Sequence, residues 1–246
     1  MHRYLAATVL VIVGLLWLGL DALAQDAAQP TYVITYMEIA PGLASEARQL
    51  ILAYSADARK ASGAAQVDAL ERIGYPNHFA LIEQWQSPSA KQAYASTDAT
   101  AKFRAALGRL QSAAYDERIH SPLSVGPSML ASPDPLVIVT HVDLIPTSVD
   151  VGIGKVRAFV EQGRGAHGNR RFDVLTQTSR KNHMTIVESW DAPANKDSWI
   201  STAVARSFRE DLQPMTAAST TSEPIRFCAD TCYKSRRMRP SNRCAS

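Results

Sequence analysis

Cysteine is missing from most of this chain. The three cysteines, Cys228, Cys232 and Cys244, all lie near the C-terminal end of the 246 residues. Their Cys-x3-Cys spacing with one further cysteine is not a usual zinc-binding pattern, and three thiols cannot all pair within one chain. We therefore expect the body to fold without disulfides or cysteine-bound metal. In the tail we favour a local disulfide over free thiols.

A second long apolar run is missing as well. Residues 4–20 form one such run behind a short basic head, and residues 22–24 read Ala-Leu-Ala, a small-x-small cleavage site. This pattern predicts a signal peptide over residues 1–24 and export to the periplasm or the outside of the cell. The length of the run leaves an uncleaved anchor as the alternative. We expect no stable membrane span after cleavage.

A strong basic excess is missing from the body of the chain. Residues 226–246 hold six basic residues and one acidic residue, a local +5, so the rest carries about −2 of the net +3. The composition of the body therefore gives no indication of a basic surface that binds nucleic acid. The glycine-containing segment around His167 lacks the Lys-Ser/Thr of a phosphate loop. The tail, residues 227–246, is predicted to be a solvated end, with contact to an anionic membrane as the alternative.

What the chain does contain is a duplication. Residues 33–107 align without a gap onto residues 138–212, with nineteen identities in seventy-five positions. A unit of about 100 residues is too long for a solenoid repeat and suits a small domain. The sequence thus predicts a first repeat over residues 31–121, a proline-rich linker over 122–135 and a second repeat over 136–226.

Both repeats have the same order of elements. In the first repeat, alternating or β-rich segments, turn residues and helical periodicity predict strand 32–39, helix 43–62, strand 67–73, strand 78–86, helix 88–111 with a break near 96–97, and a strand near 115–120. The second repeat follows with strand 136–145, helix 151–163, strand 171–178, strand 183–191, helix 194–212 and a strand near 221–226.

This β-α-β-β-α-β order is the ferredoxin-like split motif, an α+β fold whose helices cover one face of an antiparallel sheet. The other face needs a cover. Two tandem copies can cover each other, sheet against sheet. We therefore predict tandem ferredoxin-like repeats that form a pseudo-dimeric α/β barrel within one chain, and leave a further homo-oligomer open.

One motif recurs in both repeats. Glu83-x-Trp85-x-Ser87 and Glu188-x-Trp190 each follow a strand–helix–strand unit and precede a helix. In this the chain resembles the antibiotic biosynthesis monooxygenase family, which has dimeric α/β-barrel folds and includes cofactor-free quinol monooxygenases and haem-degrading relatives. The resemblance implies a monooxygenase-like protein without a cofactor or metal.

The haem-degrading branch is the less similar one. Tyr94 and Trp199 occupy a helix position where those relatives have a Trp that lines the haem pocket. Where they have an iron-ligating histidine, this chain has Arg104 and Arg209. Because the nitrogen ligand is missing, we do not expect haem degradation by that scheme.

Strand alternation selects the candidate catalytic residues. Tyr36 and Glu38 share one face of the first strand, and His141 and Asp143 share the matching face in the second repeat. The resemblance implies that the ligand cavity is the space between the two sheets. A histidine held by a carboxylate can abstract a proton from a phenol or quinol, so His141 and Asp143 are the predicted proton acceptor. The alternative is a rim hydrogen bond without a catalytic role.

Further residues are predicted to contact the substrate. Aromatic side chains can stack on a planar ligand, and arginines can hold an anionic group. Glu83 and Glu188 are interpreted as structural, with a role in the cavity as the alternative, and His78 and His183 as rim and turn residues. The predicted substrate-binding set is Tyr36, Glu38, Trp85, Tyr94, Trp190, Trp199, Arg104 and Arg209.

Two functions remain open from the sequence. The first is an exported, cofactor-independent monooxygenase-like enzyme that acts on a small aromatic or quinol. The second is a non-catalytic binding or assembly module of the same fold, because duplicated copies can keep a fold after losing a site.

Overall fold

The structure is a computed structural model, and it describes residues 29–127 and 135–216 together with the backbone of 225–229. The predicted signal peptide, half of the predicted linker and most of the basic tail lie outside these residues. Within the described ranges, no helix is both long and apolar enough to cross a membrane.

The first repeat has the predicted order of elements. It comprises β1 (Thr31–Glu38), α2 (Ala44–Ala58), β2 (Ala64–Arg72), β3 (His78–Trp85), α3 (Pro88–Ala95), α4 (Asp98–Gly108) and β4 (Asp116–Ser124). The break in the second helical segment falls at Ser96 and Thr97. There the Thr97 hydroxyl accepts a hydrogen bond from the Thr100 N–H (3.2 Å) and caps α4.

The second repeat follows the same plan. It comprises β5 (Leu136–Asp143), η1 (Pro146–Ser148), α5 (Val149–Gly163), β6 (Asn169–Gln177), β7 (His183–Trp190), α6 (Pro193–Ile200), α7 (Ala203–Leu212), η2 (Gln213–Met215) and β8 (Ile225–Ala229). Two expected boundaries were wrong. Residues 227–229, assigned to the solvated tail, belong to β8, because they pair with β2 of the first repeat. Pro122 belongs to β4, opposite Leu175 of β6, and not to the linker, because β4 continues past the first repeat to pair with the second.

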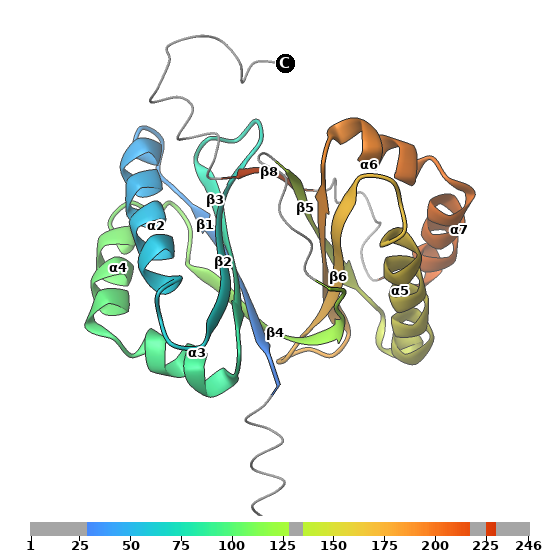
Figure 1. The fold of residues 1–246 in the computed structure, drawn as a ribbon, viewed down its shortest axis with the longest axis horizontal. Coiled ribbons are helices and arrows are strands. Elements are labelled where there is room, and N and C mark those ends of the chain that lie inside the picture. Colours follow the sequence, from blue (N-terminus) through green and yellow to red (C-terminus); the bar gives the residue numbers. More distant parts are fainter. Residues whose placement is uncertain (1–28, 128–134, 217–224, 230–246) are drawn as a thin grey trace, which may run out of the picture.

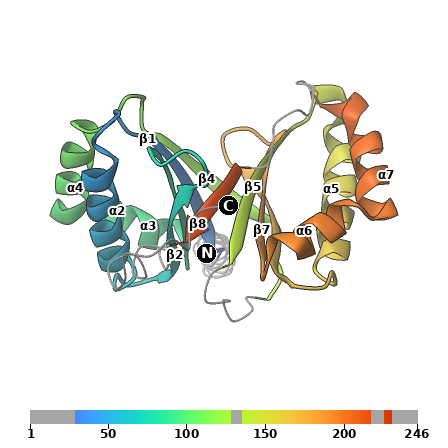
Figure 2. The ribbon, with the colours of Figure 1, turned by 90° about the horizontal axis from the view of Figure 1, so that it is seen from above.

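The eight strands close into one barrel in the order β1-β3-β2-β8-β5-β7-β6-β4. Closure depends on the last strand of each repeat: β4 pairs with its own β1 and with β6, and β8 pairs with its own β5 and with β2. Figures 1 and 2 show the helices of the two repeats outside the strands on opposite sides. The predicted fold, a pseudo-dimeric α/β barrel of two ferredoxin-like units, is confirmed.

Identical turn residues of the two repeats make the same contacts. The Asn77 side chain donates to the Ile39 carbonyl (3.1 Å), and Asn182 donates to the Leu144 carbonyl (2.9 Å). Arg59 and Arg164 each donate from Nε to a carbonyl of the following strand. The repeated identities thus brace the chain where strands and helices end.

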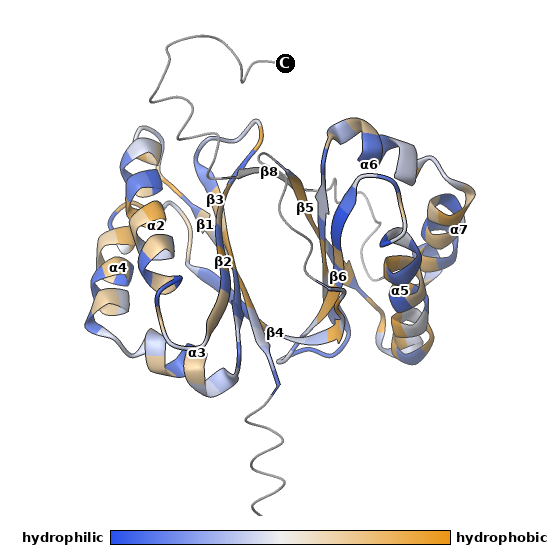
Figure 3. Cartoon of the chain, in the orientation of Figure 1, coloured by the Kyte–Doolittle hydropathy of each residue, from blue (hydrophilic) through white to orange (hydrophobic). Residues whose placement is uncertain are grey.

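The alternation along β1 is as predicted. Met37 and Ile39 pack beneath the helices of the first repeat, whereas Tyr32, Ile34 and Tyr36 face the inside of the barrel. Hydrophobic residues lie along strands of both halves, and the helices mix hydrophobic and hydrophilic residues (Figure 3). Each sheet therefore buries both faces, one against its helices and one against the other repeat.

The space between the sheets was expected to be a ligand cavity, and its central residues instead pack as a core. Opposite strands contribute side chains that are at most 5% exposed, and these contact one another across the barrel. They are Tyr32, Ile34, Leu70, Ala80, Ile82, Val139, Leu175 and Val187. The duplication thus closes the barrel around a hydrophobic cluster.

Candidate functional site

The Glu-x-Trp motif lies on the helix-covered face of each sheet. The Trp85 indole N–H donates to Glu83 Oε2 (2.9 Å), and that of Trp190 donates to Glu188 Oε2 (2.9 Å). Both tryptophans are fully buried beneath their helices. Strand alternation therefore places them on the other side of the sheet from His141, and the expectation that they share its site was wrong.

Glu83 lies among aromatic side chains. The Tyr54 hydroxyl donates to Glu83 Oε1 at 3.4 Å, and the Tyr54 ring stacks on Phe103 at 4.0 Å between centroids. Tyr94 follows beside Trp85, with ring centroids 5.3 Å apart. Burial raises the pKa of Glu83, and the N–H of Trp85 offsets part of this rise by stabilising the carboxylate.

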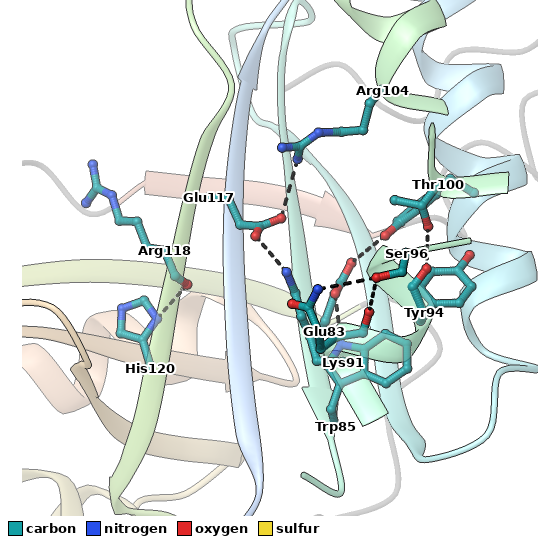
Figure 4. Close-up of polar contacts among 12 residues, drawn as sticks. Glu83, Trp85, Lys91, Tyr94, Ser96, Thr100, Arg104, Glu117, Arg118 and His120 are labelled. Carbon is teal, nitrogen blue, oxygen red and sulfur yellow. Dashed lines mark hydrogen bonds and ion pairs between the residues drawn. The ribbon is translucent and has the colours of Figure 1, made fainter. Parts of the chain in front are cut away.

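Two cations lie near Glu83 but bind another carboxylate. Lys91 Nζ lies 2.7 Å from Glu117 Oε1, and Arg104 lies 3.4 Å from Glu117 Oε2. The Arg104 guanidinium also covers the Tyr115 ring, 3.4 Å from its centroid. Figure 4 shows Glu117 between the two cations, with Glu83 beside Trp85. The Glu83 carboxylate itself is hydrogen-bonded by Trp85 and Tyr54 alone among the described residues.

The corresponding place in the second repeat has a different chemistry. Lys196, the counterpart of Lys91, pairs directly with Glu188 (2.6 Å), and both side chains are less than a tenth exposed. Phe159 replaces Tyr54, and stacks on Phe208 at 3.9 Å. The second copy is therefore internally neutralised, whereas the first has a buried carboxylate beside a tyrosine hydroxyl.

Tyr94 and Trp199, predicted to wall the His141 site, also lie beneath the helices. Both are about a tenth exposed or less, and each packs in the helix-side core of its own repeat. The Trp199 indole N–H is buried and has no hydrogen-bond partner among the described residues. Arg209 donates to the Ile200 carbonyl (3.2 Å) on the surface. The predicted aromatic walls thus belong to two separate sites, one per repeat.

His141 does lie inside the barrel, in a chain of hydrogen bonds between the repeats. Its Nε2 is 3.3 Å from the Arg118 guanidinium and its Nδ1 is 3.3 Å from the Thr185 hydroxyl. That hydroxyl is 3.0 Å from His120 Nε2, and His120 Nδ1 is 2.9 Å from the Arg118 carbonyl. Figure 4 shows the contact between His120 and Arg118.

The direction of this chain is fixed at both ends. A guanidinium can only donate and a carbonyl can only accept, so Arg118 donates to His141, His141 donates to Thr185, and His120 donates to the Arg118 carbonyl. Burial lowers the pKa of His120 and of His141 to about 4, so both imidazoles are neutral at pH 7. The Thr185 hydroxyl therefore donates to His120 Nε2.

The predicted pair of His141 and Asp143 is not formed. Asp143 instead pairs with His183 Nδ1 (2.8 Å) at the partly exposed end of the strands, where a rim contact was expected for His183. Glu38, the counterpart of Asp143, is exposed at the end of β1. Tyr36 touches the His141 ring edge-on, 5.4 Å between centroids, and its buried hydroxyl has no partner among the described residues.

The sequence pointed to some members of these sites and missed others. Lys91 and Lys196 were visible as repeated identities, and Tyr54 against Phe159 was visible as a difference. The roles of Glu117, Arg118 and His120 had no such signal, because they depend on pairing between distant strands. In the described part of the chain, no group of three or more His, Cys, Asp or Glu side chains could hold a metal ion.

Together these features define a tandem α/β-barrel protein with one buried acidic site per repeat. Residues 30–106, most of the first repeat, match the family model for antibiotic biosynthesis monooxygenase. The first repeat is thus similar to antibiotic biosynthesis monooxygenase domains, and the resemblance inferred from the Glu-x-Trp motif is confirmed. No curated protein matches the chain significantly.

Solved structures share the whole two-repeat arrangement. A proposed monooxygenase from Fusobacterium nucleatum superposes with a TM-score of 0.71 at 12% identity, over 82% of this chain and 92% of its own. One from Lactobacillus acidophilus gives 0.64 at 11% identity, over 82% and 93%. An anthrone oxidase-like protein gives 0.62 at 12% identity, over 82% and 90%. At these identities, the likeness establishes the fold of both repeats.

Proposed function

We propose that the first repeat oxidises a small phenol or quinol with molecular oxygen, and that Glu83 accepts the substrate proton. The observation that carries this proposal is the contrast between Glu83 and Glu188. Both are buried and both accept from a tryptophan, but Glu188 is neutralised by Lys196 and Glu83 is not paired with a cation. A buried carboxylate with a raised pKa is suited to general base catalysis.

Tyr54 indicates how a substrate would bind. Its own phenol hydroxyl donates to Glu83 Oε1, but at 3.4 Å the contact is long. A substrate phenol that displaced Tyr54 would meet the same carboxylate oxygen. Trp85, Tyr94 and Phe103 would supply aromatic surface around its ring.

The chemistry follows from loss of that proton. The phenolate transfers one electron to oxygen, and the resulting radical pair combines to form a carbon–oxygen bond. One oxygen atom stays in the product, and the other leaves as water with two hydrogens from the substrate. The substrate anion itself is the reductant, so no cofactor is needed. The likeness to an anthrone oxidase-like fold supports aromatic substrates of this kind.

The test is oxygen uptake with a panel of hydroquinones, naphthols and anthrone. Loss of a general base typically lowers the rate about 10²–10⁴-fold. We expect that loss for Glu83→Gln, and little change for Lys196→Met/Glu188→Gln, the control in the second repeat that leaves no buried charge alone. His141→Ala examines the competing assignment from sequence. If the rate falls for His141→Ala and not for Glu83→Gln, the proposed site is wrong and the reaction takes place inside the barrel, at His141.

A non-catalytic module is the second candidate, and the packed core between the sheets is the observation that favours it. A panel without oxygen uptake, together with saturable binding of an aromatic ligand, would support this function over oxidation. Binding of such a ligand would be followed through the fluorescence of Trp85 and its loss in a Trp85→Phe variant.

We also propose that the protein is exported. The support is the sequence of residues 1–24, with Ala22-Leu23-Ala24 as the cleavage site. Mass spectrometry of protein from cell fractions tests this. A mature N-terminus at Gln25 in the exported fraction is expected, and an intact Met1 in the cytosol would contradict it.

A further inference from the structure

Glu117 binds two cations near Glu83. It receives Lys91 on one carboxylate oxygen and Arg104 on the other, at 2.7 and 3.4 Å. Glu117 belongs to β4, which pairs with β1, and its side chain points to the helix-covered side where Glu83 also lies. Lys91 lies in the first turn of α3, eight residues after Glu83, and its charge acts on the Glu83 carboxylate as well.

The second repeat shows the other partner that this lysine can take. Lys196 occupies the place of Lys91 and binds Glu188 directly at 2.6 Å. Among the described residues, Glu188 is the one carboxylate that pairs with Lys196. The two halves thus differ in the partner of their lysine, which is Glu117 in the first repeat and the motif glutamate in the second.

We propose that Glu117 is a positioning residue that holds Lys91 away from Glu83 and so keeps the Glu83 carboxylate available as a base. The role of Glu83 as a base is that of the proposed function; the positioning itself is a property of the three side chains. The electrostatics act in the same direction, because the charge of Glu117 raises the pKa of Glu83 and that of Lys91 lowers it.

The inference is tested by titrating Glu83 without substrate. The protein is labelled with ¹³C at glutamate side-chain carboxyls, and the Glu83 resonance is assigned by its loss in Glu83→Gln. An opposite charge moved into contact typically lowers a carboxyl pKa by about 1–3 units. In Glu117→Gln, Lys91 is released, and we expect the Glu83 midpoint to fall by at least about one pH unit.

A double variant separates this effect from a general disturbance. In Glu117→Gln/Lys91→Met the released cation is absent, so most of the fall should be reversed; the midpoint should stay slightly below that of the parent protein, because the charge of Glu117 is lost as well. Arg104→Met removes the more distant partner of Glu117 and should leave the midpoint within a few tenths of a unit. An unchanged midpoint in Glu117→Gln overturns the inference, and so does an equal fall in the double variant.

The outcome is independent of whether the protein oxidises quinols. If the midpoint falls and recovers as expected but oxygen uptake is absent, the positioning role stands and the proposed function fails. If uptake depends on Glu83 but neither the midpoint nor the pH profile of kcat/KM changes in Glu117→Gln, the proposed function stands and the positioning role fails.

Discussion

Tyr36 and His141 occupy the same position in the two repeats, and their rings meet across the barrel at 5.4 Å between centroids. Equivalent residues that touch must lie close to the axis that relates the two repeats. In a homodimer, symmetry would place the same side chain on both sides of such an axis. The duplicated chain is free of that restriction, and it uses the freedom to join Arg118 and His120 of one repeat to His141 and Thr185 of the other.

The first prediction concerns acid. His120 and His141 have pKa values lowered to about 4 from the usual 6.5, so the unfolded chain binds more protons than the folded one between these values. Stability from the neutral imidazoles is complete above pH 6.5 and is lost as the pH falls towards 4. We expect the free energy of unfolding to drop by up to about 1.4 kcal/mol per pH unit for each histidine.

Urea unfolding between pH 7 and 4.5 measures this slope. Carboxylates add a slope of their own at the acidic end, so the comparison is with His120→Gln/His141→Gln, in which the histidine contribution is absent. The double variant should be less stable at pH 7 and less sensitive to acid. Parallel curves for the two proteins would show that these histidines are not buried in their neutral form.

The second prediction concerns Thr185, which both accepts from His141 and donates to His120. Thr185→Val keeps the shape of the side chain but leaves two buried imidazole nitrogens without a partner. An unsatisfied buried polar group typically costs about 1–3 kcal/mol. We expect a loss of that size in urea unfolding at pH 7. The exposed Thr147→Val is the matched control and should change stability little.

The third prediction compares the two lysines. Lys196 is 8% exposed and pairs with a buried glutamate, whereas Lys91 is 13% exposed and pairs with the more accessible Glu117. Removing one partner of a buried pair typically costs about 3–5 kcal/mol, but about 0–1 for an exposed pair. Lys196→Met should therefore destabilise the protein far more than Lys91→Met. Lys196→Met/Glu188→Gln should recover part of the loss, since no buried charge is left alone.

The fourth prediction uses two glycines of α5. A side chain at Gly154 would meet no atom within 4 Å, whereas one at Gly163 would collide with the Phe172 ring. Alanine in an open helix position stabilises by about 0.5–1 kcal/mol relative to glycine. We expect Gly154→Ala to raise the melting temperature and Gly163→Ala to lower it. A rise in both would mean that Phe172 moves aside at little cost.

Local patterns predicted most of the fold. Alternation in residues 32–39 predicted the first strand, and Ser96-Thr97 predicted the break between two helices. Both signals depend only on residues that are close in sequence. The end of β4 was missed, since Pro122 and Ser124 are strand residues only through their pairing with β6 of the other repeat.

The candidate site was predictable only in part. Trp85, Tyr94 and Arg104 were expected near the substrate, and they do surround or border Glu83. His141 was expected to pair with its strand neighbour Asp143. The actual partners come from β4 and β7, and periodicity along one strand carries no information about which residues other strands bring opposite.

The sequence by itself determined that the chain contains two similar units in tandem, each with the ferredoxin-like order of strands and helices. Hydrophobic periodicity, turn residues and the repeated Glu-x-Trp motif depend only on residues that are close in sequence. Only the tertiary structure decided that the two units differ at the site. Glu83 and Glu188 have nearly the same local sequence, but near the first the lysine is bound by Glu117, which comes from a strand more than thirty residues further along the chain. Charge interactions act through space, so the state of each carboxylate is set by what the closed barrel places beside it.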